Sequence, residues 1–258
     1  MNRKIQSAPS LSPYNAQPRI AKRSVKIKLK KTSFIDFPAR ISSVFFFSGC
    51  NLRCPWCHNR ELITGEAQDL ADIEEGFAHL QKRRSVLGGV VLSGGEPCLC
   101  GELPLIISKI KKIPLPVKLD TNGMFPAMLE KIFRAKETSP DYIALDLKIA
   151  PARYAELALK EGSGDNLIHS AALIRESGIV HEYRTIALPG GYISAEDIEA
   201  LAPLADNAPW YFRPFAGGNC LESAWDGLEE PAAEARARLE ALAARARELG
   251  KKACVPEL

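Results

Sequence analysis

The stretch ISSVFFFSGCNLRCPWCHN, residues 41–59, joins a run of apolar and β-branched residues to a loop that carries three cysteines. The apolar run predicts a strand buried on both faces, as strands of parallel sheets are. Cys50, Cys54 and Cys57 follow where that strand ends. The stretch therefore predicts a strand that delivers a three-cysteine loop to one edge of a sheet.

Further strands of the same kind alternate with helical patterns along the chain. Strands are predicted at 89–95, 117–123, 142–148, 181–190 and 210–215, and helices at 70–84, 101–112, 125–137, 165–177, 195–206 and 231–249. Such alternation is typical of parallel sheets with right-handed crossovers. Six units without a break predict one α/β domain, an incomplete (β/α)6 barrel with a parallel sheet and a C-terminal helix. A flat doubly wound sheet is the alternative.

The composition predicts a soluble protein with a sizeable core, since 46% of the 258 residues are hydrophobic and 25% are charged. A net charge of +3 does not indicate nucleic acid as a partner. No apolar run approaches the roughly 18 residues of a membrane span, and no secretory pattern is present, so we expect a cytoplasmic protein without a membrane partner.

The basic charge is concentrated near the N-terminus. Nine Lys or Arg and no Asp or Glu occur in residues 1–31. We interpret residues 1–24 as a basic tail, with a transit peptide as the alternative. The domain then covers 25–258, and its first strand, VKIKLK, would turn alternate lysines to water.

The seven cysteines are an odd number, and without an export signal they predict reduced thiols rather than disulfides. Three thiolates on one loop can hold three irons of a 4Fe–4S cluster, which leaves the fourth iron open to a substrate. A structural zinc site would need a fourth ligand. His58, next to Cys57, is poorly placed to supply it, although a distant cysteine could. A zinc-binding α/β module without enzymatic activity therefore remains the alternative.

Polar residues also end the other predicted strands. The second strand ends in Gly94-Gly95-Glu96, the third in Asp120-Thr121-Asn122, the fourth carries Asp146 and Lys148, and the fifth carries Arg184. Ligands of parallel α/β folds bind at these carboxyl ends. Gly94 and Gly95 let the backbone approach a ligand, and Glu96 can accept from an ammonium group. Beside an open iron, this bend predicts a ligand with an amino group, although a simple turn would have the same sequence.

Together these motifs resemble the radical S-adenosylmethionine (radical SAM) superfamily. FFFSGCNLRCPWCHN, followed about forty residues later by LSGGEP, carries the resemblance, and Trp56 and the CHN after it narrow the match to the activating enzymes of glycyl-radical enzymes. KTSFIDFPARISSVFF, LDTNG, ALDLK and RTIALPG extend it, so that it covers about 25–215. Within that family the chain is most similar to the activators of anaerobic ribonucleoside-triphosphate reductase, with those of pyruvate formate-lyase nearby.

The resemblance implies a role for each motif. Cys50, Cys54 and Cys57 would ligate a 4Fe–4S cluster whose unique iron is chelated by the amino and carboxylate groups of SAM. The residues implied to contact SAM are Gly94, Gly95 and Glu96 at its amino group, Trp56 beside its adenine, and Asn122, Lys148 and Arg184. Asp120, Thr121 and Asp146 would help to hold a monovalent cation and the SAM carboxylate. Asp36, Lys148 and Arg184 are the candidate catalytic residues, with Asp36 near the incoming substrate loop.

The implied activity is that of an oxidoreductase. The reduced cluster would pass an electron to SAM, and the resulting 5′-deoxyadenosyl radical would take a hydrogen atom from a glycine of the partner, a glycyl-radical enzyme. The resemblance favours anaerobic ribonucleotide reductase as that partner. A flavodoxin- or ferredoxin-type donor would supply the electron. A radical SAM enzyme that acts on a small molecule or peptide is the alternative.

Other residues have less specific interpretations. Cys98, Cys100, Cys220 and Cys254 are scattered, which argues against a second cluster, and Cys98 and Cys100 are expected to pack at the start of a helix. His79, His169 and His181 are expected to be structural or exposed. The segment GGNCLESAWD, 217–226, resembles the loop after the last strand of the reductase activators. It would either shape a rim for partner docking or simply lead to the last helix.

Overall fold

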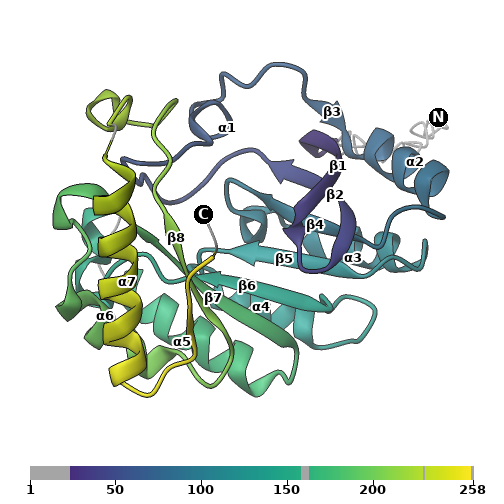
Figure 1. Cartoon of the computed structure of the whole chain (residues 1–258). Helices are drawn as coiled ribbons and strands as arrows, with labels where there is room; N and C mark the ends of the chain where they lie inside the picture. Colours follow the sequence, from purple (N-terminus) through teal and green to yellow (C-terminus); the bar gives the residue numbers. More distant parts are fainter. Residues whose placement is uncertain (1–23, 158–162, 229, 257–258) are drawn as a thin grey trace, which may run out of the picture.

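The computed structural model describes residues 24–157, 163–228 and 230–256 (Figure 1). The basic tail predicted at 1–24 lies, apart from Ser24, outside the described residues. Among the residues described, no helix has both the length and the hydrophobicity that crossing a membrane requires.

All strands that the structure describes belong to one sheet of nine strands, in the order β3-β1-β2-β4-β5-β6-β7-β8-β9. The strands are β1 (Lys26–Phe37), β2 (Arg40–Phe47), β3 (Ala71–Asp72), β4 (Gly89–Gly94), β5 (Val117–Thr121), β6 (Tyr142–Asp146), β7 (Val180–Ala187), β8 (Trp210–Pro214) and β9 (Ala253–Cys254). The strands from β2 to β9 along this order are parallel, whereas β1 pairs antiparallel with both β2 and β3.

The six predicted parallel strands are all present, and the sheet stays open. Figure 1 shows β1 and β2 at one end of the sheet and β8 at the other. The predicted incomplete barrel is thus confirmed. The first predicted strand is longer than VKIKLK, because it continues to Phe37 and forms a hairpin with β2. The two-residue strands β3 and β9 were not predicted, since they are too short to show a pattern.

The predicted helices are present with shifted ends. The helices are α1 (Arg60–Thr64), α2 (Ile73–Arg83), α3 (Leu103–Lys111), α4 (Pro126–Phe133), α5 (Ser163–Glu176), α6 (Ala195–Leu201) and α7 (Ala232–Glu248). Ser194 caps α6 as predicted, in a capping box with Asp197. The predicted helix 195–206 ends earlier, at Leu201, and a 3-10 turn that contains Pro203 follows it. The short α1 was not predicted.

The two faces of the sheet differ in chemistry. Val117 and Leu119 of β5 are fully buried in the main core, together with helix residues such as Ile107 and Leu129. Lys118, between them on the same strand, therefore points to the opposite face. We call the face on which Lys118 lies the inner face of the sheet. It carries charged side chains at the ends of the strands, where the candidate site lies.

Candidate active site

A cavity of about 190 Å³ opens at the carboxyl ends of β2 and β4 to β7. It brings together every residue that the sequence predicted for the site except Asp36. These residues are Cys50, Cys54, Trp56, Cys57, Gly94, Gly95, Glu96, Asp120, Thr121, Asn122, Asp146, Lys148 and Arg184. The order of strand ends along the sheet thus places motifs that are far apart in sequence on one wall.

The cysteine loop begins directly after β2. Gly49, whose φ of 86° favours glycine, turns the chain, and its N–H donates to the Leu62 carbonyl at 2.9 Å. A tight turn then brings the Cys57 N–H to the Cys54 carbonyl at 3.0 Å. Cys54 is buried, while Cys50 and Cys57 are half-buried. Three thiols on a short loop therefore face one cavity.

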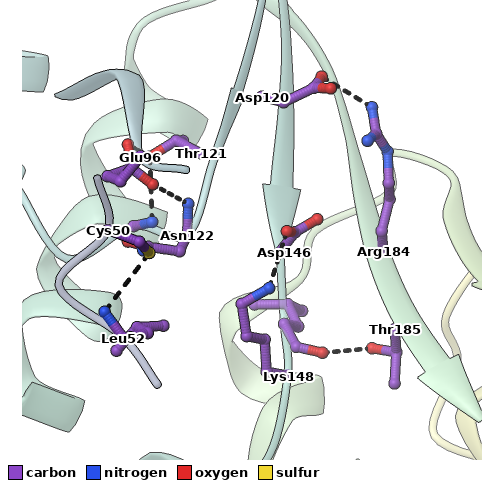
Figure 2. Close-up of polar contacts among 12 residues, drawn as sticks. Cys50, Leu52, Glu96, Asp120, Thr121, Asn122, Asp146, Lys148, Arg184 and Thr185 are labelled. Atoms are coloured by element: carbon purple, nitrogen blue, oxygen red, sulfur yellow. Dashed lines mark hydrogen bonds and ion pairs between the residues drawn. The ribbon is translucent and has the colours of Figure 1, made fainter. Parts of the chain in front are cut away.

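The surroundings of these thiols fit a 4Fe–4S cluster. The Leu52 N–H and the Asn122 side-chain amide approach Cys50 Sγ at 3.4 and 3.6 Å (Figure 2), and such donors stabilise cluster sulfur. Burial raises the pKa of Cys54 to about 12, against the opposing charge of Lys148. Within the described residues no group of three His, Cys, Asp or Glu side chains could hold a metal ion. Cluster ligation spreads three thiolates over three irons, which requires no shared single-ion site.

The Gly94-Gly95-Glu96 bend packs against the cysteine loop. The Gly95 N–H donates to the Phe47 carbonyl at 2.8 Å, and the Glu96 N–H donates to the Gly49 carbonyl at 2.9 Å. A Cβ on Gly95 would lie 1.9 Å from the Gly49 oxygen, and one on Gly94 would lie 2.5 Å from the Phe47 nitrogen. Both glycines are thus required by contact with the neighbouring backbone.

The Glu96 carboxylate ties this bend to the end of β5. Its side chain is only 1% exposed. It accepts from the Thr121 hydroxyl at 2.8 Å, from the Asn122 N–H at 2.7 Å and from the Cys98 N–H at 3.0 Å (Figure 2). Burial raises the pKa of Glu96, although these donors oppose the shift. Glu96 therefore orders the cavity wall through both of its oxygens.

Asp120 on β5 lies between two cations. Its Oδ1 accepts from Arg184 Nη2 at 2.9 Å (Figure 2) and from Lys118 Nζ. Burial by itself would raise the pKa of Asp120, but Arg184 and Lys118 lower it to about 2. Arg184 also donates to Glu182 at 2.6 Å. Lys118 and Glu182 had not been predicted as site residues. A lysine within the apolar strand VKLDT was the available signal, since a lysine is rarely buried without a partner.

Asp146 and Lys148 form a second ion pair, on β6 and just after it, with Lys148 Nζ 2.9 Å from Asp146 Oδ2 (Figure 2). Burial would lower the pKa of Lys148, but Asp146 raises it well above its usual value. The Lys148 backbone N–H also donates to the Tyr154 hydroxyl at 3.2 Å. A charged ammonium is therefore held beside the cysteine loop.

Trp56 is buried in an aromatic cluster that joins the cysteine loop to the segment after β8. Its ring centroid lies 5.2 Å from that of Tyr192 and 5.7 Å from that of Trp225. The Glu222 N–H donates to the Pro55 carbonyl at 3.0 Å, and His58 Nδ1 donates to the Gly218 carbonyl at 3.2 Å. In Figure 1 the segment after β8 accordingly rises toward the loop that leads to α1.

Asp36, which the resemblance placed near the incoming substrate loop, is not among the residues that line this cavity. It lies near the turn of the β1–β2 hairpin, where Phe37 pairs with Arg40, whereas the cysteines follow the other end of β2 at Phe47. A strand of eight residues spans about 25 Å. The Asp36 carboxylate accepts hydrogen bonds from Lys30 Nζ at 3.0 Å and from the Ser33 hydroxyl. The antiparallel hairpin therefore carries Asp36 to the opposite edge of the sheet.

Several lining residues had not been predicted as site residues: Leu52, Asn59, Ile63, Ser93 and Ile186. Asn59 belongs to the CHN motif, and its side-chain amide donates to the Gly94 carbonyl at 2.9 Å. His58, whose role was left open, also lines the cavity. The cysteines at 98, 100, 220 and 254 do not. Of these, Cys98 and Cys220 are buried, and the interpretation of Cys98 as a packed thiol agrees with its exposure of 2%.

Comparisons with known proteins identify relatives of this chain. The family model for the radical SAM superfamily matches residues 44–204. A protein of Methanocaldococcus jannaschii named as a glycyl-radical enzyme activating enzyme is 30% identical over 184 residues, which are 69% of this chain and 74% of that protein. The pyruvate formate-lyase-activating enzyme of Listeria monocytogenes is 29% identical over 185 residues, 68% of this chain and 73% of its own.

Solved structures share the fold at lower identity. A radical SAM methyltransferase from Sphaerobacter thermophilus superposes with a TM-score of 0.64 at 17% identity, over 87% of this chain and 68% of its own. SuiB of Streptococcus suis, solved with S-adenosylmethionine bound, has a TM-score of 0.59 at 15% identity, over 83% of this chain. The chain spans about half of SuiB, 52%. These likenesses show the fold.

Proposed function

This chain belongs to the radical SAM superfamily, among its glycyl-radical enzyme activating enzymes, and we propose that the enzyme it activates is an anaerobic ribonucleotide reductase. The observation that carries the activase chemistry is the single cavity that joins three cysteines to the Gly-Gly-Glu bend. The proposed ligands of the 4Fe–4S cluster are Cys50, Cys54 and Cys57. When bound, the cluster supplies the electron that splits the sulfonium of SAM, so that a 5′-deoxyadenosyl radical can remove a hydrogen atom from a glycine.

The chain's own residues hold and orient the reactants. We assign Lys148 and Arg184, the cationic residues of the cavity wall, to the carboxylate of SAM. The bend from Gly94 to Glu96 is assigned to its amino group, and Trp56 to its adenine. Leu52, Ile63 and Ile186 line the same cavity with apolar surface, which excludes water and stray hydrogen donors. The step requires no acid or base, so the site does not need a catalytic histidine.

The choice of the reductase rests on the segment 217–226. Its sequence resembles the corresponding loop of reductase activators, and it packs against the cysteine loop through the Glu222–Pro55 and His58–Gly218 hydrogen bonds. It therefore forms the rim over which a glycine loop of the partner would enter. The relatives that activate pyruvate formate-lyase favour that enzyme as the second candidate. A flavodoxin- or ferredoxin-type donor and a cytoplasmic location complete the proposal.

Anaerobic incubation with SAM, a reductant and each candidate enzyme tests the function. The glycine-centred doublet in electron paramagnetic resonance should appear with anaerobic ribonucleotide reductase and not with pyruvate formate-lyase. Cys54→Ala should abolish the doublet, the formation of 5′-deoxyadenosine and the iron content together, because the cluster loses a ligand. Cys254→Ala is the matched control, since Cys254 lies on β9 outside the cavity, and it should retain all three.

The possible results separate the alternatives. A doublet with pyruvate formate-lyase alone would reject the reductase as target. Formation of 5′-deoxyadenosine without a doublet on either enzyme would favour a small molecule or peptide as substrate. Full activity of Cys54→Ala would reject the proposed cluster ligands.

A further inference from the structure

The structure does not fit the monovalent cation that the resemblance implied at Asp120, Thr121 and Asp146. Asp120 Oδ1 already accepts from Arg184 Nη2 (Figure 2). The same oxygen accepts from Lys118 Nζ. The Thr121 hydroxyl donates to Glu96 at 2.8 Å. Asp146 is paired with Lys148 at 2.9 Å. Each carboxylate that would attract a cation therefore has a cationic side chain of this chain as its partner.

The ion-paired charges around Asp120 and Asp146 are balanced without an added ion. Three ion-paired carboxylates, Asp120, Asp146 and Glu182, face the three cations Lys118, Lys148 and Arg184. The side chains of Lys118 and Glu182 are 1% and 3% exposed. A further cation would add positive charge beside Lys118, Lys148 and Arg184, whose charges already compensate these carboxylates.

Lys118 occupies a distinct place within this cluster. Arg184 and Asp120 line the cavity, whereas Lys118 does not. It stands behind Asp120 on the same strand, two residues away, so that both side chains project from one face of β5. Its ammonium therefore acts on the cavity through the Asp120 carboxylate.

We propose that Lys118 supplies, from within the chain, the positive charge that a bound monovalent cation would bring to Asp120, and that the enzyme therefore binds SAM without requiring Na⁺ or K⁺. Lys118 is in this sense a positioning residue: it shares with Arg184 the neutralisation of Asp120, while Arg184 and Lys148 line the cavity where the ligand would meet them. The inference rests on the SAM cavity proposed above and is independent of which enzyme is activated.

Calorimetric binding of SAM to the cluster-loaded protein tests this inference. Titrations are compared in N-methyl-D-glucamine chloride, NaCl and KCl at equal ionic strength. The wild type should bind with the same Kd in all three salts. Lys118→Ser removes the ammonium and opens space beside Asp120. It should weaken binding about tenfold in N-methyl-D-glucamine chloride, and either NaCl or KCl should restore it toward the wild-type value.

Two further variants separate charge from packing. Lys118→Met fills the same space without charge, so it should bind weakly in every salt. Lys111→Ser is the matched control, because Lys111 pairs with Asp141 at 3.1 Å outside the cavity, and it should match the wild type throughout. A wild type that needs Na⁺ or K⁺, or a Lys118→Ser variant that neither ion rescues, would overturn the inference. The wild-type comparison keeps the test valid even where the variants do not fold. A wild type that binds no SAM in any salt would instead reject the cavity assignment.

Discussion

Gly94 and Gly95 in the candidate site have a structural reason in addition to the one expected. The sequence predicted that Gly94 and Gly95 let the backbone approach a ligand. In the structure, a side chain at either position would overlap the backbone of Phe47 to Gly49. The bend that follows β4 is thus seated directly on the start of the cysteine loop. Its position, and not only its freedom to turn, depends on the missing Cβ atoms.

Replacing Gly95 by alanine should therefore disturb the cysteine loop. The added Cβ would lie 1.9 Å from the Gly49 oxygen, so one of the two backbone segments must move. We expect the iron content after anaerobic reconstitution to fall strongly, and the free energy of unfolding in urea to fall by about 3 kcal/mol.

Gly101→Ala provides the matched control for this change. A Cβ on Gly101 has nothing within 4 Å, so iron content and stability should stay near the wild-type values, within about 0.5 kcal/mol. Normal reconstitution of Gly95→Ala would show that the contact with Gly49 does not matter for the cluster.

At the scale of elements, the segment after β8 is as much a part of the site as the strands are. Phe215 and Trp225 of this segment pack on one another with ring centroids 5.7 Å apart, and Trp225 lies 5.6 Å from Tyr192. Trp56 of the cysteine loop completes the group at 5.7 Å from Trp225. Two elements that are about 160 residues apart in sequence thus share one aromatic cluster, which covers the cysteine loop.

Trp225→Ala should loosen this cover without dissolving the core. Trp225 is half-buried, so we expect a loss of about 2 kcal/mol in the free energy of unfolding. Oxygen should then reach the cluster faster, and its visible absorbance should bleach several-fold faster in air. Trp225→Phe keeps a ring at this position and should behave nearly as the wild type. Equal bleaching rates for all three proteins would mean that the aromatic cluster does not shield the loop.

On the scale of the whole molecule, an open sheet with unequal faces explains where stability and reactivity reside. The outer face is covered by helices and apolar, whereas the inner face carries the paired charges and the cavity. Residues 90–92 of β4 and 143–145 of β6 are buried completely, since each lies between two hydrogen-bonded neighbours. The central strands, whose backbone is hydrogen bonded on both sides, therefore hold a site whose loops have fewer backbone hydrogen bonds than the strands.

Hydrogen exchange followed by mass spectrometry should reveal this division. The amides of β4, β5 and β6 should exchange slowest, because they open only with global unfolding. In the protein without its cluster, the amides of the loop 48–59 should exchange far faster than those of the central strands, because few backbone groups of this loop are hydrogen bonded to strands or helices. Equal protection of this loop and of the central strands would contradict this division.

The features that depend on local pattern could be read from the sequence. Long apolar runs such as FFF at 45–47 and VVL at 90–92 predict buried strands, because burial on both faces requires apolar residues in succession. Ser194 predicts its helix start, since its side chain bonds to a backbone N–H nearby. The order of these elements then predicts that the strand ends share one edge, which places thirteen of the fourteen predicted residues.

Features that depend on which segments meet in space were decided only by the tertiary structure. Lys118 reads as one lysine in a strand until the structure shows that it shares a carboxylate oxygen of Asp120 with Arg184, which lies 64 residues after Asp120. The sequence likewise does not show that the hairpin carries Asp36 to the edge of the sheet opposite the cysteines. The physical reason is the same in both cases: local pattern sets which residues are buried and which strand they belong to, whereas charge pairing and distance depend on contacts between distant segments, which only the folded chain creates.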